Sequence, residues 1–119
     1  MTLNRLTLIG FLGSDAEKKD GNNGSFTVFS VATKTSWKNK STGEWESRTE
    51  WHRCVASNKL AEFTATLKKG AHVHLEGELR SREYDKDGVT HRIFECRLTS
   101  ILKLDRAAVQ DEPEEDSGA

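Results

Sequence analysis

Long apolar runs are missing from this sequence of 119 residues. No apolar stretch approaches the roughly 20 residues that a membrane-spanning helix needs, and the first five residues lack the basic and then apolar order of a signal peptide. The sequence therefore predicts a cytoplasmic protein without a membrane partner.

Cysteine is scarce as well. Cys54 and Cys96 are the only two, they lie far apart, and no histidine stands near them at metal-ligand spacing. We expect both to be reduced thiols packed inside strands. His72, His74 and His91 show no metal spacing with one another, so the sequence predicts neither a metal site nor a cofactor.

Signatures of catalysis are also absent. The sequence has no Gly-rich phosphate loop, no nucleophile paired with a base, and no carboxylate cluster of the kind that metal-dependent phosphodiester hydrolysis requires. We therefore expect a binding protein rather than an enzyme.

Negative charge is concentrated at one end of the chain. The net charge is −1, but five of the 19 acidic residues lie within residues 110–119, which hold no base. Residues 1–109 carry 18 bases against 14 acids, so the body of the protein is mildly basic. A basic body suits a polyanionic ligand, with which the acidic end would compete.

Apolar residues come in short runs between polar clusters, which favours strands. Strands are predicted near residues 3–12, 25–37, 48–56, 72–82 and 89–104. One helix lies between the third and the fourth, where apolar residues recur at helical spacing, with Asn58 as its N-cap. This order predicts an all-β fold with one helix, the five-stranded OB-fold barrel, over residues 1–106. Residues 107–119 lack periodicity and predict a disordered acidic tail.

Several local features follow from the pattern. The broken alternation at Val28 and Phe29 suggests a β-bulge, and residues 38–44 suggest a long flexible hairpin loop. Four phenylalanines fit apolar faces and are expected in the core: Phe26, Phe29, Phe63 and Phe94.

Three motifs resemble those of the bacterial single-stranded-DNA-binding proteins. They are NRLTLIGFLG at residues 4–13, TEWHR at 49–53 and GAHVHLEGELR at 70–80, with KLAE at 59–62 opening the helix. The resemblance implies a homotetramer that binds and protects single-stranded DNA with little sequence preference during replication, recombination and repair. Ser57 stands where such proteins carry an aromatic residue. The acidic end also lacks their terminal apolar pair, so recruitment of replication and repair proteins by the tail is expected to be weak or absent.

Binding a strand of any sequence requires aromatic faces for the bases and basic groups for the phosphates. The predicted DNA contacts are Trp37, Trp51, Tyr84, Trp45, Lys34, Lys38, Lys40, Arg48, Arg53, Lys59, Arg80 and Arg82. Other interpretations stay open: Trp51 in the barrel core, Tyr84 as an ordinary hairpin tyrosine, Trp45 pinning its loop, and any single lysine as a solvated charge.

A subunit interface is predicted for the side of the barrel away from these aromatics. Adjacent strand residues point to opposite faces, so His52 cannot line the same groove as Trp51. The resemblance places His52 at the interface, and the two-sided apolar first strand adds Leu6 and Leu8. Two alternatives to the main interpretation are an OB-fold primosomal accessory protein and, with less support, an OB-fold nuclease.

Overall fold

The computed structural model describes residues 1–22 and 24–105. It contains β1 (Leu6–Leu12), β2 (Glu17–Gly21), β3 (Gly24–Lys38), β4 (Trp45–Ser57), α1 (Lys59–Thr64), β5 (His72–Lys86) and β6 (Val89–Lys103). The predicted tail over residues 107–119 and the last residue of the predicted domain lie outside the described residues.

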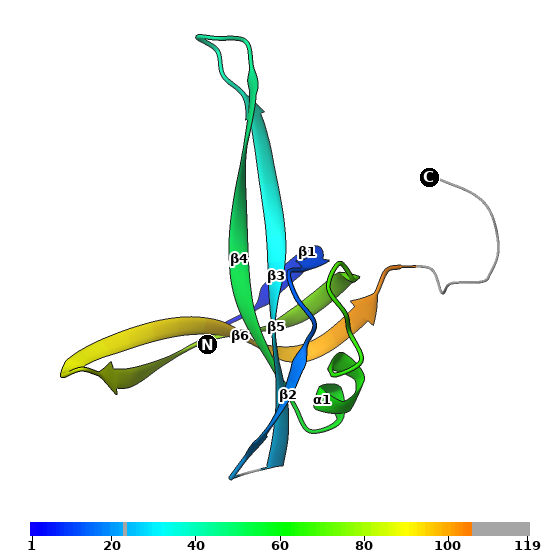
Figure 1. Cartoon of the computed structure of the whole chain (residues 1–119), viewed down its shortest axis with the longest axis vertical. Helices are drawn as coiled ribbons and strands as arrows, with labels where there is room; N and C mark the ends of the chain where they lie inside the picture. Colours follow the sequence, from blue (N-terminus) through cyan, green and yellow to red (C-terminus); the bar gives the residue numbers. More distant parts are fainter. Residues whose placement is uncertain (23, 106–119) are drawn as a thin grey trace.

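The strands close into a barrel. β1 pairs with both β3 and β5, β3 pairs with β4, β5 pairs with β6, and a parallel contact between β4 and β6 completes the ring. Figure 1 shows the β3–β4 and β5–β6 hairpins projecting from this barrel in different directions. The predicted all-β architecture with a helix between the third and fourth predicted strands is confirmed.

β2 is a sixth strand that the sequence did not predict. All five of its residues are exposed, and it pairs only with β3, from Glu17 opposite Val28 to Gly21 opposite Gly24. Its sequence, EKKDG, has no apolar alternation because neither of its faces covers the core. Backbone pairing to a long neighbour forms this strand, and such pairing leaves no hydrophobic pattern.

The barrel core is aliphatic, with one aromatic ring. Gly10 lies where β1 meets β3, and a Cβ atom there would overlap the carbonyl oxygen of Ala32, so closure of the barrel depends on glycine at this position. The buried cluster contains Leu8, Leu12, Phe29, Val31, Cys54, Leu67, Ala71, Val73, Leu75 and Cys96.

The structure of β1 contradicts part of the predicted interface, namely Leu6 and Leu8. Leu8 is buried in the core of its own barrel and Leu6 packs against that core, so both point inward rather than toward another subunit. Ile9 and Phe11 are the exposed apolar side chains of the strand. The two-sided apolar character was correctly predicted, but the face available for association is the opposite one.

The predicted bulge in β3 is wrong. Pairing with β4 is continuous from Phe26 opposite Ser57 to Lys38 opposite Trp45. The irregularity lies in the β5–β6 pairing, where Glu76 opposes Ser100 and Gly77 opposes Leu98, so that Thr99 of β6 has no partner. The inward face of β3 includes Thr27 as well as Phe29, while Phe26 is half-buried. The hydroxyl of Thr27 donates a hydrogen bond to the carbonyl of Ala61 in α1 (2.8 Å), which lets a polar side chain occupy a core position.

Phe63 and Phe94 were wrongly predicted to lie in the core. α1 turns Ala61 and Thr64 inward, which leaves Phe63 on its outer side. Phe94 pairs with Ser81 in the part of the β5–β6 hairpin that extends past the barrel, and 58% of it is exposed. Both positions fit an apolar face by periodicity, but that face extends beyond the elements that would cover it.

The β3–β4 connection is shorter than predicted, because β3 continues to Lys38 and β4 already begins at Trp45. Asn39 organises the turn between them: its Oδ1 accepts the backbone N–H groups of Ser41 (2.8 Å) and Thr42 (3.1 Å). Its own N–H donates to the carbonyl of Glu44 (2.8 Å). At the start of α1, Asn58 holds the N-cap position, but its side chain makes no capping hydrogen bond with the described residues.

Replacing Thr27 by valine is expected to lower the free energy of unfolding by about 1 kcal/mol, because a buried hydrogen bond is lost. The loss stays modest since the N–H of Ala65 still donates to the Ala61 carbonyl. Urea denaturation measures the change. Thr35→Val, at an exposed position of the same strand, serves as the control and should stay within about 0.5 kcal/mol of wild type. Equal effects of the two substitutions would contradict the role of Thr27.

Candidate nucleic-acid interface

The outer face of β4 carries both Trp51 and Arg53 and lies beside β6. Cys54 and Val55 pair with Cys96 and Arg97 in the parallel contact, so the preceding residues Arg53 and Glu95 lie side by side on the outside of the barrel. Trp51 precedes Arg53 by two residues and shares its face. With 60% of its surface exposed, Trp51 is not a core residue.

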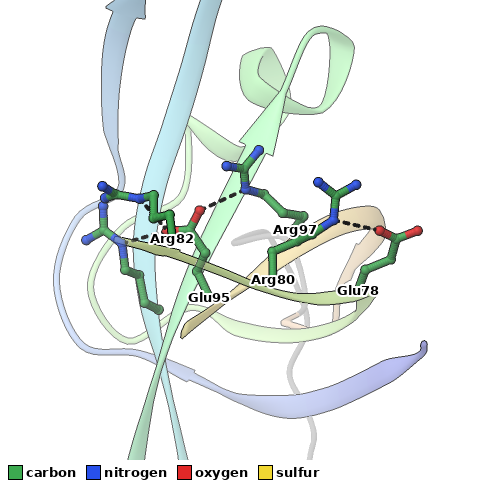
Figure 2. A network of polar contacts seen from close by, with 6 residues as sticks. Glu78, Arg80, Arg82, Glu95 and Arg97 are labelled. Carbon is green, nitrogen blue, oxygen red and sulfur yellow. Dashed lines mark hydrogen bonds and ion pairs between the residues drawn. The ribbon is translucent and has the colours of Figure 1, made fainter. Parts of the chain in front are cut away.

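A cluster of three arginines surrounds Glu95. Its Oε1 accepts hydrogen bonds from the Nε atoms of Arg53 (3.2 Å) and Arg82 (3.5 Å), and its Oε2 accepts one from Nε of Arg97 (2.8 Å). Figure 2 shows Arg82 and Arg97 reaching the carboxylate from different sides. The Glu95 side chain is only 2% exposed, so the three guanidinium groups cover it on the outside of the barrel.

The charge state of Glu95 follows from its partners. Burial alone would raise its pKa, but hydrogen bonds from Arg97 and Arg53 and the positive charges of Arg97 and Arg82 outweigh that effect. The net result is a pKa below the ordinary glutamate value. Glu95 is therefore an ionised carboxylate at neutral pH, and the cluster carries a net charge of +2.

A groove of about 520 Å³ lies against this cluster. The three arginines and Glu95 line one side, and Phe26 and Ser57 contribute to the rest of its wall. Ser57, at the end of β4, has a short side chain that leaves this space open.

The β3–β4 hairpin divides the other predicted contacts between its two faces. Directly opposed residues of antiparallel strands share a face, and Trp51 opposes Ala32. Alternation from this pair assigns Trp45, Lys34 and Lys38 to the same face as Trp51. Trp37 and Arg48 fall on the opposite face, where Nε of Arg48 forms an ion pair with Glu50 (2.9 Å). This separation into two faces was not predicted from the sequence.

The β5–β6 hairpin carries the remaining aromatic residue. Arg80, Arg82 and Tyr84 alternate along one face of β5, and the Tyr84 ring stacks on His91 with centroids 5.1 Å apart. Arg80 pairs with Glu78 through Nε (3.0 Å) rather than with Glu95. Tyr84 thus has one ring face covered by protein.

The other predicted side chains lie apart from the cluster. Lys40 is exposed in the turn of the β3–β4 hairpin, and Lys59 is exposed at the start of α1. Trp45, near the same turn, is 72% exposed, so it is not packed against its own barrel. His52 is half-buried, and its Nε2 lies 2.8 Å from the hydroxyl oxygen of Thr33.

A comparison with known families decides the identity. The sequence model of the Single-strand binding protein family matches residues 3–104. The chain belongs to this family.

Relatives of known name agree with this assignment. Single-stranded DNA-binding protein 1 of Xylella fastidiosa (strain 9a5c) is 48% identical over 90 residues, which cover 73% of this chain and 66% of that protein, just under two thirds. Among solved structures, the Plasmodium falciparum SSB complex with ssDNA matches with a TM-score of 0.78 at 30% identity, covering 88% of this chain and 97% of that one.

A deletion mutant of the single-stranded DNA binding protein from Thermus aquaticus gives a TM-score of 0.74 at 26% identity, over 87% of this chain and 51% of that one. The predicted OB-fold and the predicted family are both confirmed. The names of the family and of the Xylella protein describe binding rather than catalysis.

Cys54 and Cys96 are both free and buried, as predicted for thiols inside strands. They oppose each other where β4 lies beside β6. A hydrogen bond with Cys96 and burial raise the pKa of Cys54 far above its ordinary value, so it stays a thiol. Over residues 1–22 and 24–105, no group of three or more His, Cys, Asp or Glu residues is placed to hold a metal ion. The same residues include no helix long and apolar enough to cross a membrane.

Two residues that complete the cluster, Glu95 and Arg97, were not predicted from the sequence. A signal was present, because Glu95 and Arg97 alternate with Cys96 and Leu98 in a strand that is otherwise apolar at this point. Charged residues at every second position indicate a solvent-facing side. Which side of the barrel they face depends on the pairing of β6 with β4, and that pairing links segments about 40 residues apart.

Gly13 is expected to control where the Trp51 ring lies. A Cβ atom at Gly13 would overlap Cζ3 of Trp51, so the indole packs directly over the backbone of this glycine. In Gly13→Ala the ring should move outward, because a side-chain end yields more easily than backbone. In a background in which Trp51 is the only tryptophan left, acrylamide should quench the fluorescence of the Gly13→Ala variant more strongly than that of its parent. Ser14→Ala is the control, and unchanged quenching with a lowered melting temperature would show that the backbone moved instead.

Proposed function

We propose that this chain binds single-stranded DNA with little sequence preference. Bases stack on the exposed aromatic rings, and phosphates are held by lysine and arginine side chains. In this role it protects exposed strands during replication, recombination and repair, and we place it in the cytoplasm. The observation that carries the proposal is the exposed Trp51 beside a buried carboxylate ringed by three arginines, on the outer face of a barrel of this family.

The named relatives support the ligand. The Xylella protein carries single-stranded DNA binding in its name, and the Plasmodium structure is a complex with ssDNA. Stacking and phosphate contact are available to every base, so this surface needs no sequence-specific groups. The predicted contacts and the groove beside the arginines belong to this proposal, and recruitment of other proteins by the acidic tail is not part of it.

We also propose that the chain forms a homotetramer. Strand pairing aligns Ile9 with His74 and Leu102, and Phe11 with His72, on the outer face of β1, β5 and β6. Ile9, Phe11 and Leu102 are all more than half exposed in the single chain. A contiguous apolar patch of this kind on a small protein is typical of an association surface.

The binding proposal predicts that poly-pyrimidine strands quench the tryptophan emission strongly and that duplex DNA quenches it weakly, because only unpaired bases offer their faces. Trp51→Ala and Trp37→Ala should each weaken binding by roughly 1–3 kcal/mol. Circular dichroism should show an intact fold in both variants, since both rings are exposed. Equal quenching by duplex and single strands would contradict the stacking role.

The assembly proposal predicts a tetramer in sedimentation at micromolar concentration. Ile9→Glu should produce smaller species, because a charge would be buried at the contact. Val89→Glu, at an equally exposed apolar residue where the β5–β6 hairpin turns, should leave the tetramer intact. His52 opposes Val31 and so lies on the other face from the patch that contains Ile9. Its predicted interface role is therefore separate, and a bulky residue at His52 should loosen the assembly without removing a DNA contact. A monomeric wild-type protein at this concentration would refute the proposal.

A further inference from the structure

The three arginines around Glu95 all use the same atom to bind it. Arg53, Arg82 and Arg97 each donate from Nε, the inner nitrogen of the guanidinium group. Their six outer nitrogens form no hydrogen bond with any protein group in the described part of the chain. In Figure 2 the outer ends of Arg82 and Arg97 point away from the carboxylate. The carboxylate thus fixes each arginine and leaves its outer donors available.

Three guanidinium groups gathered around one carboxylate also lie near one another, and their positive charges repel. Each lies within 3.5 Å of a Glu95 oxygen, and each side chain is 39–47% exposed. Without the carboxylate, these long side chains would separate into water, where their rotamers are free. Glu95 is therefore the group that keeps them together.

We propose that Glu95 is a positioning residue, which holds Arg53, Arg82 and Arg97 as a preformed receptor for a phosphodiester group of single-stranded DNA. The inference rests on the proposed function and adds Arg97 to its contacts. Arginine outer nitrogens form charge-assisted hydrogen bonds with phosphate oxygens. The groove of about 520 Å³ beside the cluster gives a strand access to it.

The position of the receptor suits the stacking surface. Arg53 follows Trp51 by two strand residues, a rise of about 7 Å on the same face. Tyr84 follows Arg82 by two residues on the outward face of β5. A strand whose bases stack on these rings therefore carries phosphates past the arginine cluster.

Glu95→Gln separates this inference from simple charge attraction. The substitution makes the binding face more positive by one charge, so attraction alone predicts tighter DNA binding and an equal or steeper salt dependence. Loss of positioning predicts the reverse, because the arginines no longer hold their outer donors in place. We expect about tenfold weaker binding of an oligothymidylate of about 16 nucleotides, the upper range for one OB-fold, measured by tryptophan quenching.

Salt dependence and an abasic strand supply readouts that a general structural defect would not move. Each phosphate contact adds about 0.7 to the slope of log affinity against log salt for single strands. Glu95→Gln and Arg97→Gln should each flatten the slope by about that amount. Both should also weaken an abasic strand of the same length by the same factor as oligothymidylate, whereas Trp51→Ala should leave abasic binding unchanged.

Arg92→Gln is the matched control. Arg92 is also on β6, but it points to the other face and pairs with Glu83 and Ser81, so it should keep the wild-type slope. Wild-type or tighter binding by Glu95→Gln with an unaltered slope would overturn the inference. If that variant does not fold, Arg97→Gln decides alone, and an unchanged slope refutes the receptor. Failure of the wild-type protein to bind oligothymidylate would instead refute the proposed function.

Discussion

The parallel contact between β4 and β6 is the constraint on which both the core and the polar face depend. Its register sets Cys54 opposite Cys96 inside the barrel. Because neighbouring strand residues point to opposite sides, the same register sets Arg53 beside Glu95 on the outside. A slip by one residue would exchange the two pairs and place unpaired charges in the core. The cost of burying such charges fixes the register, and the register fixes the arginine cluster.

Aromatic rings contribute little to the core of this barrel. Phe29 is the one aromatic residue in the buried cluster, which otherwise consists of aliphatic side chains, alanine and the two thiols. The three tryptophans and Tyr84 lie on strands that extend into the two hairpins, and all four are exposed. Stability and stacking are therefore assigned to different residues. A ring that packs no core can be placed where a base reaches it, as Trp51 is over Gly13.

The sequence predicted the order of the elements because alternation and helical spacing are local properties. It also predicted that the side chains of Trp51 and His52 point to opposite faces of the strand, since that follows from the strand period alone. Local patterns failed where the outcome depended on distant partners. Phe94 has the right parity for the core, but no strand covers it beyond the barrel. β2 has no apolar face and forms only because β3 is long enough to pair with it. Trp37 and Trp51 belong to opposite faces because of the hairpin register, which neither strand determines alone.

Glu95 was not recognised as part of the site for a related reason: in a sequence, an acidic residue counts only as a loss of positive charge from a basic surface. In the folded protein, however, Glu95 orders the three arginine side chains. A ligand that must gather three free arginines loses binding energy to the entropy of their side chains. Glu95 brings the arginines together when the chain folds, so their side chains lose this entropy on folding rather than on ligand binding. One unit of positive charge is lost in return. The exchange is favourable when the ligand is recognised by geometry as well as by sign, and a phosphate, whose oxygens accept several directed guanidinium hydrogen bonds, is such a ligand.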